Sequence, residues 1–116
     1  MTVDLETWII ETGDSVIQKL NDAGASSLTA IERAIYWMWS IDYAVRNSGS
    51  FGPLQNIEST AIHDLHAFAT NTGLPKLASW LESAADEPTF CESYYEQFEK
   101  PCFELREAYN VRSTLL

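Results

Sequence analysis

The stretch from Thr29 to Gly49 constrains the fold more than any other part of the sequence. Thr29 and Glu32 have the spacing of a capping box, in which both side chains satisfy free backbone amides at the start of a helix. Apolar residues then recur at steps of three and four up to Val45, and two tryptophans add apolar surface on other faces. A helix that is apolar around most of its circumference has to be buried, so this pattern predicts a central helix with others packed around it.

Helical spacing of apolar residues continues through the rest of the chain, and no strand pattern of useful length interrupts it. Further helices are expected over residues 3–21, 55–72 and 75–85, and from Thr89 onward. Gly13 predicts either a kink in the first helix or its division into two, and Gly73 and Pro75 predict a boundary between two others. A second capping box is expected at Thr89, and Pro101 should kink the C-terminal helix that follows.

These patterns predict an all-α protein. Its 116 residues fit one acidic domain over 1–116. The fold class expected is a single-domain helical bundle of about five to six helices, with the C-terminal helix kinked near Pro101.

The charge balance narrows the classes of partner. Seventeen Asp and Glu face seven Lys and Arg, which gives a formal net charge of -10. Such a charge repels the phosphates of nucleic acids and anionic membranes, and it attracts basic proteins. The simpler interpretation is that the acidity serves solubility alone.

Three features of the sequence bear on the cellular compartment of the protein: its apolar runs, its first residues and its two cysteines. No apolar run approaches the length of a membrane span, and residues 1–6 lack the basic start of a signal peptide. Cys91 and Cys102 are too far apart on one helix for a disulfide, and they suit small core residues in a reducing compartment. A cytoplasmic protein is therefore expected.

The C-terminal segment carries the densest group of carboxylates. On a continuous helix most of them lie opposite an apolar face, where they form either a solvated surface or a row presented to a basic partner. Phe103 would project among these acids on an unkinked helix, as an interface anchor does, and a kink at Pro101 would turn it inward. The candidate partner-binding residues are Asp86, Glu87, Glu92, Glu96, Glu99, Phe103, Glu104 and Glu107.

Catalytic and metal-binding patterns are weaker. His63 and His66 are three residues apart and can share a helix face, but spacing fixes no third ligand. No nucleophile elbow, glycine-rich phosphate loop or activated cysteine appears. We therefore expect no enzyme and no cofactor, and we keep a metal- or ligand-binding helical protein using the two histidines as the alternative.

Asp42 stands out within the apolar central helix, because a carboxylate there needs a partner. It could pair with Arg46 at i+4, or accept hydrogen bonds from the turn over 47–51. The segment 32–51 resembles the signature of the DNA-mimic protein family, small acidic bacterial domains that are mostly of unknown function. The residues that carry the resemblance are Trp39, Asp42, Asn47, Gly49 and Phe51.

The resemblance covers about residues 28–85 and departs from the family after the turn, where Gly52, Pro53 and Leu54 replace the expected residues. It implies an all-helical fold in which the motif residues are structural. It also implies a member that occupies the DNA-binding surface of a transcription factor, while acidic domains of this type can equally act as immunity proteins against toxins.

The function expected is a non-enzymatic module that neutralises or inhibits a basic protein, either a transcription regulator or a toxin. We expect no direct contact with nucleic acid or membrane. A homodimer that uses the aromatic residues of the C-terminal segment is the third possibility.

Overall fold

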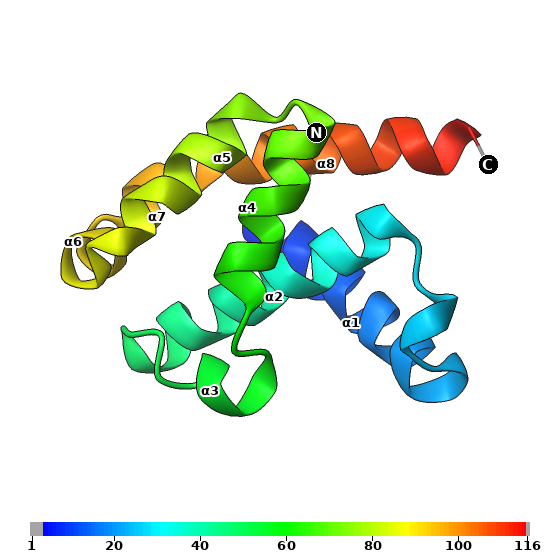
Figure 1. Cartoon of the computed structure of the whole chain (residues 1–116), viewed down its shortest axis with the longest axis horizontal. Helices are drawn as coiled ribbons and strands as arrows, with labels where there is room; N and C mark the ends of the chain where they lie inside the picture. The colour runs from blue at the N-terminus through cyan, green and yellow to red at the C-terminus, as the bar shows by residue number, and fades with distance from the viewer. Residues whose placement is uncertain (1–3, 116) are drawn as a thin grey trace.

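The computed structural model describes residues 4–115, and the side chains of residues 4–111. Within that range the chain is helical throughout and has no strand, which confirms the expected all-α class (Figure 1). There are more helices than expected, because two of the predicted ones are divided. The elements are α1 (Leu5–Ala23), η1 (Ala25–Ser27), α2 (Ala30–Ser48), α3 (Leu54–Ile57), α4 (Ala61–Thr72), α5 (Pro75–Glu82), η2 (Ser83–Ala85), α6 (Glu87–Glu92), α7 (Tyr94–Gln97) and α8 (Glu99–Leu115).

The helices form two layers that α4 joins. Figure 1 shows α1, α2 and α3 in one layer, α5, α7 and α8 in the other, and α4 crossing between them. One hydrophobic core runs through both layers. None of the helices within residues 4–115 combines the length and the apolar character needed to cross a bilayer.

The central helix is α2, as the sequence predicts. The capping box is present: Glu32 N donates to Thr29 Oγ1 at 3.3 Å, and Thr29 N donates to Glu32 Oε1 at 2.8 Å. Gly49 ends the helix in the left-handed conformation, with φ of 66°. The inward residues come from most of the circumference and include Ile31, Ala34, Ile35, Met38, Ile41, Ala44 and Val45.

The predicted division of the first helix at Gly13 is wrong, because α1 is one continuous helix. The kink that was the other expectation stays a prediction. Gly13 is buried where α1 crosses α2, and a Cβ added there would lie 2.3 Å from Cδ1 of Trp39. The glycine therefore makes room for the tryptophan ring. A single glycine inside a helix costs about 1 kcal/mol, which a well-packed helix can tolerate.

The helix expected over 55–72 is divided into α3 and α4. Glu58 has an extended conformation, with φ of -159°, and closes α3 after a single turn. The next boundary agrees with the prediction, since Gly73 is left-handed at the end of α4 and Pro75 opens α5.

The expected single C-terminal helix is divided into α6, α7 and α8, with interruptions at Ser93 and Phe98. Pro101 lies in the first turn of α8, where its missing N–H needs no partner, so the chain changes course just before the proline.

The start of this segment also differs from the prediction. Asp86, not Thr89, caps α6, and it accepts hydrogen bonds from Thr89 N and Thr89 Oγ1. As a result Phe90 and Tyr94 are buried, while Cys91 is only half-buried and Tyr95 is exposed.

Candidate functional site

Asp42 is the one carboxylate within residues 4–111 that is buried, with 3% of its surface exposed. Its Oδ1 accepts from Arg46 Nε at 2.7 Å, which confirms the predicted i+4 pair. The same atom accepts from Tyr94 Oη at 2.6 Å. Tyr94 lies 52 residues further along the chain, on α7, so no local spacing could have predicted this partner.

Arg46 completes the buried group. Its guanidinium carbon lies 5.7, 5.0 and 5.2 Å from the ring centres of Tyr94, Tyr95 and Phe98, within the range of cation–π attraction. Nη2 lies 3.2 Å from Oε1 of Glu6, although the two are not aligned as a hydrogen bond. The guanidinium therefore links α1, α2 and α7.

The ionisation of this group follows from its burial. Burial raises the pKa of Asp42, and this effect outweighs the hydrogen bonds from Tyr94 and Arg46, which lower it. Burial and the neighbouring Asp42 raise the pKa of Tyr94 well above its usual value, so its hydroxyl stays a donor. Asp42 thus accepts from both Arg46 and Tyr94, and this arrangement links helices α2 and α7.

The other residues of the sequence motif also make internal contacts. Trp39 stacks on Tyr43 at 5.4 Å and fills the space above Gly13. Asn47 Nδ2 donates to the Tyr43 carbonyl at 2.8 Å, close to the end of α2. Phe51 packs against Phe90 with ring centres 5.4 Å apart. Each of these contacts shapes the fold.

Three of the predicted partner-binding carboxylates bind backbone amides within the molecule. Asp86 caps α6, and Glu87 Oε2 accepts from Phe51 N at 3.0 Å. Glu104 Oε1 accepts from Leu77 N at 2.9 Å, and its Oε2 accepts from Lys76 N at 3.3 Å, both in the first turn of α5. These side chains hold loops and helix starts in place, in addition to any role at the surface.

The remaining four predicted carboxylates are different. Glu92, Glu96, Glu99 and Glu107 are exposed, and their side chains form no hydrogen bond or ion pair with the described residues. The interruptions at Ser93 and Phe98 mean that Glu92 and Glu96 belong to helices other than α8.

Glu99, Phe103 and Glu107 follow one another at steps of four on α8 and therefore share one face. We call these three residues the α8 acidic face. Phe103 projects outward, with 45% of its surface exposed, and the guanidinium of Arg106 lies 5.0 Å from its ring centre. The structure therefore presents an aromatic ring between two carboxylates.

The two histidines lie apart from this face, on α4. His63 is exposed, and His66 Nε2 lies 3.0 Å from Glu82 Oε2. No group of three metal-ligating side chains occurs among the residues that the structure describes. Cys102 is buried, and burial raises the pKa of its thiol well above the usual value, so this thiol stays protonated.

Comparison with known proteins leaves the function open. No protein-family model, curated protein or solved structure matches the chain. The resemblance to the DNA-mimic family stays a prediction. What the protein does is therefore inferred from the geometry and charge of the described residues.

Proposed function

We propose that this protein is a non-enzymatic binding module that docks its α8 acidic face on a basic protein. Glu99 and Glu107 supply charge on either side of Phe103, and Glu92 on α6 and Glu96 on α7 are further exposed carboxylates of the C-terminal segment. The observation that supports this most is the exposed ring of Phe103 between two carboxylates that have no partner in the described structure.

The physical basis is that neither feature is needed by the fold. An exposed aromatic ring gains free energy when a partner covers it, and aromatic residues are frequent anchors at protein interfaces. Carboxylates around the ring steer a basic partner toward it and oppose acidic ones. Salt screens exposed charges, so association with the partner should become slower and binding weaker as the salt concentration increases.

Two kinds of basic partner fit this surface. A transcription regulator exposes cationic groups that normally contact DNA phosphates, and carboxylates can take the place of those phosphates. A toxin with a cationic active surface also offers positive charge to these carboxylates. If the partner is such a toxin, the chain is an immunity protein. In both cases we infer a cytoplasmic protein that acts by covering a surface and carries out no reaction.

Two triple variants of equal charge provide the test. E96K/E99K/E107K reverses three exposed carboxylates of the C-terminal segment, and E11K/D14K/D22K reverses three exposed carboxylates of α1. Each immobilised variant and the native chain are exposed to a lysate of the source organism at low salt. We expect a basic protein that the native chain and the α1 variant retain and the C-terminal variant loses.

The retained protein is then purified and its affinity measured at two salt concentrations. A DNA duplex of about 20 base pairs covers two half-sites one helical turn apart, as a dimeric regulator contacts them. Competition by this duplex for the partner would identify a DNA mimic, and a partner indifferent to DNA would favour an immunity protein. If both variants retain the same proteins as the native chain, the proposed docking face is wrong.

A further inference from the structure

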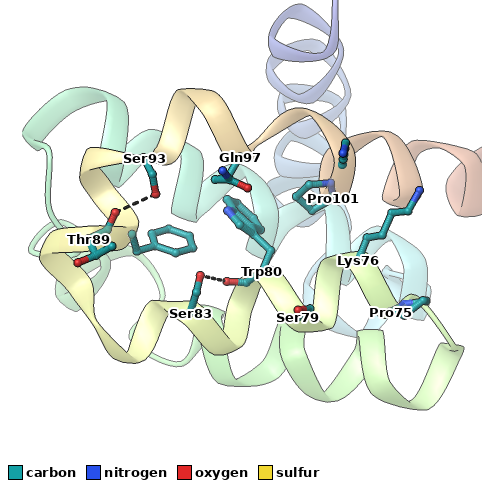
Figure 2. Close-up of a pocket in the computed structure, with 11 residues that line it drawn as sticks. Pro75, Lys76, Ser79, Trp80, Ser83, Thr89, Ser93, Gln97 and Pro101 are labelled. Atoms are coloured by element: carbon teal, nitrogen blue, oxygen red, sulfur yellow. Dashed lines mark hydrogen bonds between the residues drawn. The ribbon is translucent and has the colours of Figure 1, made fainter.

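A groove of different chemistry lies between α5 and the segment formed by α6, α7 and the start of α8. Its volume is about 630 Å³, which is in the range of small-molecule sites. Figure 2 shows the two walls facing each other, with Ser79 and Ser83 on one and Ser93 and Gln97 on the other. Trp80 lies between the walls.

Trp80 presents a hydrogen-bond donor to this groove. The residue is only 7% exposed, and its ring packs on Phe90 and Tyr94 with centres 4.8 and 5.6 Å apart. No described residue accepts a hydrogen bond from its indole Nε1. Figure 2 shows the indole nitrogen on the side of the ring that faces Gln97. The Trp80 Nε1 atom is not among the fully buried polar atoms that lack a partner, so it is accessible from the groove. The groove therefore suits a ligand that accepts a hydrogen bond from this N–H.

Two lysines make one part of the groove cationic. Lys76 and Lys100 both line it, and both also line the neighbouring hollow beside Leu5, Glu99 and Phe103. Neither ammonium group lies within ion-pair distance of a carboxylate among the described residues. In a chain with only seven Lys and Arg, two unpaired lysines at one site provide a local positive charge.

Three hydroxyl groups of the groove are hydrogen-bond acceptors, in contrast to the lysines and the Trp80 indole, which are donors. Ser83 Oγ donates to the Trp80 carbonyl, and Ser93 Oγ donates to the Thr89 carbonyl at 2.9 Å. Thr89 Oγ1 donates to Asp86 Oδ2 at 3.0 Å. Because their hydrogens are already used, these oxygens offer lone pairs only. This part of the groove therefore accepts hydrogen bonds from a ligand.

We propose that this groove binds a small organic anion. Its carboxylate or phosphate accepts hydrogen bonds from the two lysines and from the Trp80 indole. Its apolar body lies over the Trp80 and Phe90 rings, and a hydroxyl or amide N–H at its other end donates to the serine and threonine oxygens. The groove adjoins the α8 acidic face, because Lys76 and Lys100 also line the hollow beside Glu99 and Phe103, but its binding chemistry is the opposite and does not depend on the proposed docking.

The test uses the full chain labelled with nitrogen-15, in which the four tryptophans give four indole N–H signals. The Trp80→Phe variant identifies the signal of Trp80. The probes are 4-(hydroxymethyl)benzoate, 4-(hydroxymethyl)phenyl phosphate and the uncharged 4-(hydroxymethyl)benzamide. We expect a saturable shift of the Trp80 signal with an anionic probe, and an affinity for the amide that is lower by about tenfold or more. The tighter of the two anions identifies the preferred head group.

Two double variants control for charge. K76Q/K100Q should weaken binding of the anionic probe by about tenfold or more. K19Q/R33Q removes the same net charge away from the groove and should leave the affinity unchanged. The three other indole signals report whether each variant keeps its fold.

The proposal is overturned if neither anion gives a saturable shift up to about 10 mM, a concentration that detects even weak binding. It is also overturned if the amide binds as tightly as the acid, or if K76Q/K100Q binds as tightly as the native chain.

Discussion

Asp42 and Glu107 are both carboxylates on long helices, yet their surroundings are opposite. Asp42 is buried and accepts from Arg46 and Tyr94, so its charge is matched inside the molecule. Glu107 is exposed beside Phe103, and its side chain has no partner among the described residues. A buried charge must be paired for the protein to fold, whereas an exposed one has no such requirement. The fold therefore accounts for Asp42, and only an external partner or solubility can account for Glu107.

Glu104 lies between these extremes. It is half-buried and binds two backbone amides at the start of α5, so it has a structural contact at the surface. Its position shows that closeness in sequence to the α8 acidic face does not decide what a carboxylate does. The partner of each side chain decides it.

Among these substitutions, Asp42→Ala should lower the free energy of unfolding the most. The substitution leaves the buried Tyr94 hydroxyl without its acceptor and leaves the half-buried Arg46 guanidinium with Glu6 alone, and breaking a buried pair typically costs about 3–5 kcal/mol. Urea unfolding at neutral pH measures the loss. The matched control, Glu107→Ala, should change the free energy of unfolding by less than about 0.5 kcal/mol. Equal effects of the two substitutions would remove the distinction between the two carboxylates.

The pH dependence of stability should distinguish Asp42 further from the exposed Glu107. Its pKa is raised in the folded state, so between the usual value and the raised one the folded chain holds a proton that the unfolded chain has lost. The contribution of Asp42 to stability is therefore greatest at acidic pH and declines as pH rises through this window, by about 1.4 kcal/mol for each unit between the two pKa values.

Asp42→Asn provides the reference, because asparagine does not titrate. The stability of the native chain relative to this variant should fall between about pH 4 and the raised pKa, as the sign of the shift requires. Urea unfolding of both proteins at several pH values measures it. A relative stability that instead rises with pH would mean that the ion pair with Arg46 outweighs burial.

The smallest structural effect is expected from Glu104→Ala. Losing a side chain that accepts from the first amides of a helix typically costs about 1 kcal/mol. Thermal or urea unfolding, compared with Glu107→Ala, measures the difference. If Glu104→Ala is as harmless as the control, the contact with α5 contributes nothing, and Glu104 belongs with the exposed carboxylates.

The parts of the fold that local sequence determines were predictable. The capping box at Thr29, the left-handed Gly49 and the boundary at Gly73 and Pro75 each depend on residues within a few positions. The pairing of Asp42 with Arg46 follows from i+4 spacing in the same way. These features need no knowledge of the tertiary structure.

The features that were missed depend on contacts between distant segments. Gly13 looked like a helix breaker because its partner Trp39 lies on another helix. The division of the C-terminal segment follows from the packing of Phe90 and Tyr94 into the core, which overrides a continuous helical pattern.

The candidate site was predictable to a similar degree. The exposure of Glu99 and Glu107 follows from the pattern of polar residues on α8, and a Pro101 kink that would turn Phe103 inward is not what the structure shows. The contact of Glu87 spans 36 residues and those of Glu104 span 27 and 28, so spacing could not reveal them.

The hydrogen bond between Tyr94 and Asp42 has a consequence for how the molecule opens. Helices of six and four residues, such as α6 and α7, cannot persist alone in water. They are held by ring contacts, by the contact of Glu87 with Phe51 N and by this hydroxyl, whereas α1 and α2 share an extended apolar contact. Amide protons of α6 and α7 should therefore exchange with solvent together, through a partial unfolding that leaves the α1–α2 pair protected.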